Sequence, residues 1–343
     1  MPYDTSIKDK QQFELIISDF PSFIKGYFRT REIRLGYKTM ISYAYDYKVF
    51  IDFLKKNNPS LKDKPTCQIG IEDFTKITVE DVEEFIAYLK LTCKKNTSVY
   101  RRLSSLSSLY TYLQKRDLIE KNPFLLIDRE KRKKKEVIRL ETDETLALKY
   151  SIKTGYGFTD KQVERNKHNT RDYAIFSVLL NEGLRVSELI NINVDDLDLQ
   201  RNSVGIIRKG GDFETIYLSD ESLDAITDYL DIRDKYLTEE TKEEKALFLS
   251  QAHKRMSVRN VELLLKKYMR VSNPSKEQAI HVHSLRATFA TDFYSETSDI
   301  MLLKQKMGHK SIETTTIYTD VEKKKMENSR NVITKARNRD TSE

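Results

Sequence analysis

Three apolar stripes with the spacing of an α-helix occupy the first third of this chain, and they constrain its fold more than any other feature. In one of them Tyr43, Tyr47, Phe50 and Leu54 follow one another at steps of four, three and four, and the stripe ends before Asn57-Asn58-Pro59. Residues at this spacing lie on one face of a helix, where they can be buried together. The pattern predicts a helix that begins after Gly36.

The other two stripes carry helix-start signals. Thr78-Val-Glu-Asp81 has the form of a capping box, and apolar residues follow it at helical spacing up to Leu89. The third helix is expected to begin near Asn96, with Arg101 and Arg102 off its apolar stripe. Three amphipathic helices in succession predict a small helical bundle that ends near Asn122-Pro123.

The length of 343 residues allows two domains, and a basic run marks the predicted boundary between them. The run Arg129-Glu-Lys-Arg-Lys-Lys-Lys135 is the densest cluster of positive charge in a chain with 60 Lys+Arg, 53 Asp+Glu and a net charge of +7. We therefore expect a helical domain over 1–128, a linker over 129–136 and a second domain over 137–343. The cationic side chains of the run can be a solvated linker or can lie along phosphates; they are Lys131, Arg132, Lys133, Lys134 and Lys135.

The second part of the chain combines helices with one β-hairpin. Two β-prone runs, 203–209 and 213–218, flank Gly210-Gly211-Asp212, which favours a turn. A mostly apolar helix is expected from Asp172 to Glu182, and Gly183 can end it so that Arg185 sits at the junction with the next helix. The polar stretch 153–170 reads as a loop between two helices.

Several classes of protein are disfavoured. The two cysteines, Cys67 and Cys93, form no CxxC pair and no disulfide framework, so a reducing environment fits. The start of the chain lacks an apolar signal region, and the apolar stretch 174–180 is too short to span a bilayer, which predicts a cytoplasmic protein without membrane attachment. Gly211-Asp212 stands where a P-loop needs Lys-Ser/Thr, and HExxH is absent, so neither an ATP site nor a metal site is expected.

The remaining chemistry-bearing residues of the C-terminal half are of the kinds that bind phosphate or attack it. Each of them alone is explained as well by a helix cap, a surface charge or a packed aromatic ring. These residues are Arg185, Lys209, His283, Arg286, His309 and Tyr318.

Taken together, three segments resemble the conserved boxes of the tyrosine recombinase (phage integrase) family. They are Gly183-Leu-Arg185-Val-Ser-Glu188-Leu, His283-Ser-Leu-Arg286-Ala-Thr-Phe-Ala-Thr291 and Met307-Gly-His309-Lys-Ser-Ile-Glu-Thr-Thr-Thr-Ile-Tyr318-Thr. They occur in the family's order, and the hairpin lysine Lys209 falls between the first and second. The strong resemblance runs from about residue 137 to 319, and the helical N-terminal part resembles the family's core-binding domain more loosely.

The resemblance implies a mainly α fold, with a helical-bundle core-binding domain and a helical catalytic domain that carries a small antiparallel hairpin or sheet, closing on DNA as a C-shaped clamp. It implies that Tyr318 is the nucleophile, that Arg185 and Arg286 bind the phosphate oxygens, and that Lys209 protonates the leaving 5′-oxygen. His283 and His309 would position the phosphate and assist the tyrosine proton. No metal or cofactor is implied.

The same resemblance implies double-stranded DNA sites as substrate and a homotetramer on two paired sites, with a second recombinase or an accessory protein also possible. The helix that carries Arg101 and Arg102 is then expected to contact the DNA groove or backbone. The segment after the tyrosine, near 331–339, would dock on a neighbouring protomer, and the protein would act in a bacterial nucleoid. Two alternatives stay open at this point: a type IB topoisomerase-like enzyme, and a catalytically silent DNA-binding regulator or accessory subunit. The product of recombination is open among integration, excision, inversion and resolution.

Overall fold

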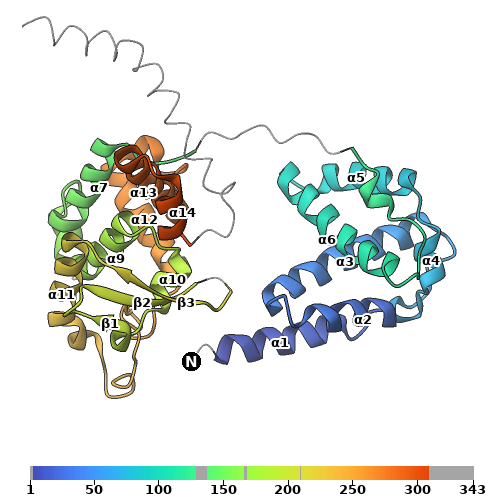
Figure 1. Ribbon diagram of the computed structural model, residues 1–343, viewed down its shortest axis with the longest axis horizontal. Helices are drawn as coiled ribbons and strands as arrows, with labels where there is room; N and C mark the ends of the chain where they lie inside the picture. Colours follow the sequence, from blue (N-terminus) through green and yellow to red (C-terminus); the bar gives the residue numbers. More distant parts are fainter. Residues whose placement is uncertain (1–2, 129–136, 166–167, 209, 309–343) are drawn as a thin grey trace, which may run out of the picture. The chain divides into compact units, whose positions relative to one another are not determined.

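The computed structural model describes residues 3–128, 137–165, 168–208 and 210–308. The chain divides into two compact units, Met1–Lys133 and Lys134–Glu343 (Figure 1). Both units are mainly helical, and the second contains a small antiparallel sheet, which confirms the predicted fold class. No helix in these ranges is long and apolar enough to cross a membrane.

The first unit is built from helices, of which three are the amphipathic helices that the sequence predicts. The predicted helix after Gly36 is α3, and the capping box of the next is formed, since Thr78 Oγ1 accepts from the Asp81 amide while Asp81 accepts from the Thr78 amide at 2.8 Å. The described helices of this unit are α1 (Tyr3–Ile17), α2 (Ser22–Arg31), α3 (Tyr37–Asn57), η1 (Thr66–Gln68), α4 (Ile71–Thr75), α5 (Val79–Thr92), α6 (Asn96–Gln114) and η2 (Pro123–Leu125).

Aromatic rings fill the core of the first unit. The Phe50 ring lies 4.9 Å from the Phe85 ring and 5.6 Å from the Phe124 ring, so α3, α5 and η2 meet there. Edge-on ring pairs of this kind add to the stabilisation that comes from burial alone. The core therefore joins segments that are remote in sequence, such as those of Phe50 and Phe124.

The second unit surrounds one central helix with other helices and a sheet on its periphery. Its elements are α7 (Thr142–Thr154), α8 (Asp160–Arg165), α9 (Asn169–Asn181), α10 (Val186–Asn191), η3 (Val194–Asp196), β1 (Leu197–Asp198), β2 (Ser203–Ile207), β3 (Phe213–Tyr217), α11 (Asp220–Arg233), η4 (Asp234–Tyr236), α12 (Val258–Ser272), η5 (Pro274–Lys276), α13 (Val282–Thr297) and α14 (Ile300–Lys306).

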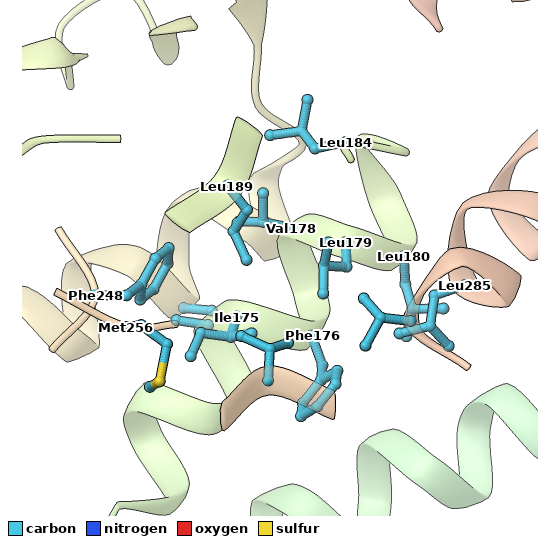
Figure 2. Packing of buried hydrophobic residues seen from close by; sticks show 14 of the residues in the cluster. Ile175, Phe176, Val178, Leu179, Leu180, Leu184, Leu189, Phe248, Met256 and Leu285 are labelled. Carbon is cyan, nitrogen blue, oxygen red and sulfur yellow. The ribbon is translucent and has the colours of Figure 1, made fainter. Parts of the chain in front are cut away.

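Helix α9 is buried along nearly its whole length and forms the centre of the core. Figure 2 shows Ile175, Phe176, Val178, Leu179 and Leu180 of this helix among side chains from later segments of the unit. A helix that is apolar on most faces needs partners on most sides. Helices α7, α11 and α13 all contact α9, and Arg286 of α13 donates to the carbonyl of Gly183, which follows α9.

The sheet has the order β1-β2-β3, with both pairs antiparallel. The predicted hairpin is β2 and β3, and Gly210 and Gly211 in its turn have φ of 125° and 95°, a region that glycine favours. The two-residue strand β1 is an addition that the sequence pattern does not predict, because a strand this short has no measurable alternation.

The predicted loop 153–170 is partly wrong. Helix α7 extends to Thr154 and ends at Gly155, whose φ of +77° makes it a left-handed cap, and helix α8 then occupies the middle of the stretch. Ser151 Oγ donates to the Tyr156 carbonyl across this turn at 2.9 Å. The short helix is not predicted because its six residues span less than two turns, too few for an apolar stripe.

Candidate active site

Arg185 is held at the start of α10 by Glu188. Gly183 has φ of +62° and turns the chain after α9, so that Arg185 becomes the residue preceding the first turn of α10. The Arg185 amide donates to Glu188 Oε2 at 2.9 Å, and its Nη1 donates to Glu188 Oε1 at 2.7 Å. The Arg185 side chain is 25 % exposed, so its guanidinium is fixed on one side and reaches solvent on the other.

Arg286 converges on the same place from α13. Its side chain is buried, and its Nη1 donates to the Gly183 carbonyl at 2.6 Å and lies 3.9 Å from Glu188 Oε2. Its Nη2 donates to the Met307 carbonyl at the end of α14. The two arginines predicted to bind phosphate are thus brought together around one buried carboxylate, although 101 residues separate them in sequence.

His283 lies one turn before Arg286 on α13. Partial loss of hydration and the positive charges of Arg286 and Arg185 lower the pKa of His283 below its ordinary value of 6.5. The imidazole is therefore mostly neutral at pH 7 and can accept a proton. The two guanidiniums can bind two oxygens of an anion such as a phosphate, and the neutral imidazole can accept a proton from a group beside it.

The other predicted catalytic residues, Lys209, His309 and Tyr318, lie outside the described residues, as does the basic run with Lys131, Arg132, Lys133, Lys134 and Lys135. The structure does describe the neighbours of two of them. Arg208 precedes Lys209, and Gly308, with φ of +58°, precedes His309.

Glu188 and Arg208 belong to the same charged cluster, although the sequence pattern alone assigns neither of them a role in the site. Glu188 is 3 % exposed and accepts from Arg185 and from Arg208, whose Nη1 lies 3.1 Å from Glu188 Oε2. A signal for Arg208 existed, because the period of two along β2 places it on the buried side with Val204 and Ile206. An arginine at a position whose alternation demands burial indicates a partner carboxylate.

The two arginines of α6 that were predicted to contact DNA share an ion pair inside the first unit. Arg101 Nη1 and Nη2 each donate to a carboxylate oxygen of Asp46 at 2.6 Å, and Arg102 Nε lies 3.6 Å from the same carboxylate. Asp46 is 2 % exposed, whereas 47 % of the Arg101 side chain is exposed. Asp46 thus fixes Arg101 and neutralises part of its charge, and contact of either arginine with DNA stays a prediction.

Within the described ranges, no three His, Cys, Asp or Glu side chains gather closely enough to hold a metal ion. The charged cluster around Glu188 is instead dominated by guanidinium groups.

Comparison with known proteins identifies the class of protein. A model of the phage integrase family matches residues 157–325, and a model of the phage integrase N-terminal SAM-like domain matches residues 22–117. Tyrosine recombinase XerC of Caldanaerobacter subterraneus is 35 % identical over 329 residues, which cover 92 % of this chain and 88 % of that protein. Tyrosine recombinase XerS of Streptococcus thermophilus is 28 % identical over 345 residues, which cover 91 % and 95 % respectively.

Among solved structures, the fold is similar to that of XerH site-specific recombinase in a post-cleavage complex with palindromic difH substrate. That match has a TM-score of 0.68 at 18 % identity and covers 90 % of this chain and 83 % of the other. The chain belongs to the tyrosine recombinase (phage integrase) family. It is a site-specific recombinase of the Xer type, an enzyme that cleaves and rejoins DNA with a tyrosine nucleophile, and this interpretation is favoured over the two alternatives left open above.

Proposed function

We propose that Arg185, Lys209, His283, Arg286, His309 and Tyr318 form the active site of this recombinase. The observation that carries the proposal is the meeting of Arg185 and Arg286 around Glu188, from two helices that are remote in sequence. Partial burial lowers the pKa of His283, and both guanidiniums lie close enough for their charges to lower it further. Chance would not gather two phosphate-binding side chains and a neutral imidazole in this way, and the positions match the family's boxes residue by residue.

The proposed step is an in-line transfer of the phosphoryl group. Tyr318 Oη attacks phosphorus while its proton passes to a histidine, the bond from phosphorus to the 5′-oxygen breaks, and Lys209 gives that oxygen a proton. Arg185 and Arg286 neutralise the charge that develops on the nonbridging oxygens. The 3′-phosphotyrosine bond retains the energy of the broken bond, so a new 5′-hydroxyl can reverse the reaction without ATP.

Glu188 sets the charge balance of this pocket. Glu188 and Glu214, which pairs with Arg208, together face three guanidinium groups, which leaves the cluster with one unbalanced positive charge. An incoming phosphate supplies the missing negative charge, whereas a further protein carboxylate would compete with it. A buried carboxylate that orders the arginines without neutralising them fits a site built for an anion.

For its partners, we propose two double-stranded DNA sites held by a homotetramer, with the segment near 331–339 docking on a neighbouring protomer. Proteins named as Xer recombinases match this chain over most of their length, which supports DNA recombination sites as its partners. A second recombinase or accessory protein and an association with the bacterial nucleoid belong to the same proposal.

The test is covalent capture of DNA on a denaturing gel. Duplexes are prepared from the DNA that flanks the coding region. They are nicked because a short fragment is then lost after cleavage, which prevents religation. Wild-type chain and Tyr318→Phe are incubated with each duplex in parallel. Tyr150→Phe is the matched control for loss of a tyrosine hydroxyl, since Tyr150 is 56 % exposed. An adduct with the wild type and with Tyr150→Phe, but not with Tyr318→Phe, is expected. An adduct with Tyr318→Phe contradicts the assignment of the nucleophile.

A further inference from the structure

Arg208 connects three parts of the catalytic unit through one side chain. Its Nε donates to Glu214 Oε2 on β3 at 2.7 Å, its Nη1 donates to Glu188 Oε2 on α10 at 3.1 Å, and its Nη2 donates to the Lys306 carbonyl at the end of α14 at 2.9 Å. Every nitrogen of the guanidinium is therefore used. The residue is 6 % exposed, which excludes a role as a solubilising charge at the hairpin.

The backbone of Arg208 also closes the turn that contains Lys209. The Arg208 amide donates to the Asp212 carbonyl at 2.8 Å, and the Arg208 carbonyl accepts from the Gly211 amide at 3.0 Å. Lys209 is bonded directly to this residue. A residue anchored through both its backbone and its side chain limits where the Lys209 side chain can begin.

The end of α14 packs against the same guanidinium. A Cβ built on Gly308 would lie 2.8 Å from Arg208 Nε and 3.1 Å from its Cζ, so the backbone at 308 approaches to a distance that only glycine allows. Gly308 immediately precedes His309 in the sequence. Arg208 thus contacts the last described residues before His309 and is itself the residue that precedes Lys209.

A role in stability alone does not explain why Arg208 is buried with these partners. A buried ion pair contributes little net stability over an apolar pair of the same size, and Glu214 at the sheet edge could have been left in water at no cost. Arg208 instead shares the carboxylate of Glu188 with Arg185 and Arg286. The fork of a guanidinium reaches all three partners at once, which the single ammonium of a lysine cannot do.

We propose that Arg208 is a positioning residue. It fixes the hairpin that carries Lys209 by joining it to Glu188 and to the end of α14. The inference rests on the proposed function, because it requires Lys209 to protonate the leaving oxygen. Loss of Arg208 then weakens catalysis through Lys209, while Arg185 and Arg286 keep their own interactions with Glu188.

A change of leaving group separates this role from a general loss of structure. Two otherwise identical nicked duplexes are used, one with the ordinary bridging 5′-oxygen at the scissile phosphate and one with sulfur in its place. Cleavage of the second breaks the bond from phosphorus to sulfur and releases a thiolate, which needs no proton because a thiol is far more acidic than an alcohol. Rates of adduct formation are measured for the wild type, Arg208→Gln, Arg208→Lys and Lys209→Ala.

With the oxygen duplex, Arg208→Gln is expected to be slower than the wild type by about tenfold or more, a part of the roughly 10²- to 10⁴-fold that a general acid contributes. Arg208→Lys is expected to be slowed as well, because a lysine keeps the charge but cannot bridge the three partners. With the sulfur duplex, both variants are expected within about threefold of the wild type, as is Lys209→Ala. Arg201→Gln is the control, since it removes an 81 % exposed arginine next to the same sheet and should leave both rates unchanged.

Two results would overturn the inference, and a third would contradict the function on which it rests. Arg208→Gln could cleave the oxygen duplex as fast as the wild type, which removes any role in catalysis. Both Arg208 variants could be slowed equally on the two duplexes. Arg208 would then act through the phosphate-binding arginines or through folding, and not through Lys209. A wild-type chain that forms no adduct with either duplex would instead contradict the proposed function itself.

Discussion

Replacing Glu188 by Gln tests the charged cluster directly, because the change keeps the shape of the side chain and removes its charge. Glu188 is buried and receives hydrogen bonds from the Arg185 amide, Arg185 Nη1 and Arg208 Nη1 at 2.7 to 3.1 Å. Removing one partner of a buried ion pair costs about 3 to 5 kcal/mol, because the other charge stays buried without compensation. The glutamine oxygen still accepts one of these bonds, so we expect the lower end, about 3 kcal/mol.

The assay is thermal unfolding of the full-length chain by calorimetry. For a unit of about 200 residues, 1 kcal/mol corresponds to a shift in Tm of about 2 to 4 °C, so Glu188→Gln should lower the Tm of the catalytic unit by about 6 to 12 °C. Glu262→Gln is the control, because Glu262 forms an exposed pair with Arg259 at 3.6 Å and should change stability by less than about 1 kcal/mol. Sulfate should raise the Tm of Glu188→Gln more than that of the wild type, since it supplies the missing negative charge. A Tm for Glu188→Gln equal to that of the control would refute the reasoning.

Three further predictions concern a glycine, a histidine and the basic run. Gly183→Ala should destabilise the catalytic unit by about 2 kcal/mol or more in urea unfolding, because its Cβ would lie 2.2 Å from Phe289 Cδ1 at a φ of +62°; a change under about 0.5 kcal/mol would contradict this. The pKa of His283 is lower in the folded chain than in the unfolded chain, so the unfolded chain takes up the proton first as pH falls. The contribution of His283 to stability is therefore complete above pH 6.5 and is lost as pH falls through the lower pKa of the folded chain. For the same reason kcat/KM for cleavage should hold down to pH 6.5 and decline below it, and His283→Gln should lack that decline. Neutralising Lys131 to Lys135 should reduce the slope of log affinity against log salt by about 0.9 for each phosphate that the run no longer neutralises, and an unchanged slope would assign the run to a plain linker.

The sequence predicts those elements whose signals are local. The stripe from Tyr43 to Leu54 and the capping box at Thr78 place α3 and α5 correctly, since helical spacing and a cap are both properties of neighbouring residues. Gly210 and Gly211 identify the β2-β3 turn for the same reason. The boxes around Arg185 and Arg286 predict the centre of the site because the family resemblance, rather than any single residue, marks them.

Interactions between remote segments could not be predicted in this way. Arg208 meets Glu188 and the Lys306 carbonyl, 20 and 98 residues away in sequence, and Arg101 meets Asp46, 55 residues away. Local patterns describe Arg101 and Arg102 only as charges off an apolar stripe, and a carboxylate on another helix changes their interpretation. Such pairs depend on how helices pack, which periodicity within one segment does not encode.

The identity of the residue that carries the DNA tests the central claim most directly. The covalent adduct is digested with trypsin and nuclease, and the remaining nucleotide is located by mass spectrometry. Cleavage after Lys310 and Lys323 gives a peptide of residues 311–323 whose single tyrosine is Tyr318. The proposed active site predicts the nucleotide on this peptide, bonded through a 3′-phosphate to Tyr318. A nucleotide on any other peptide, or a bond through a 5′-phosphate, would contradict it.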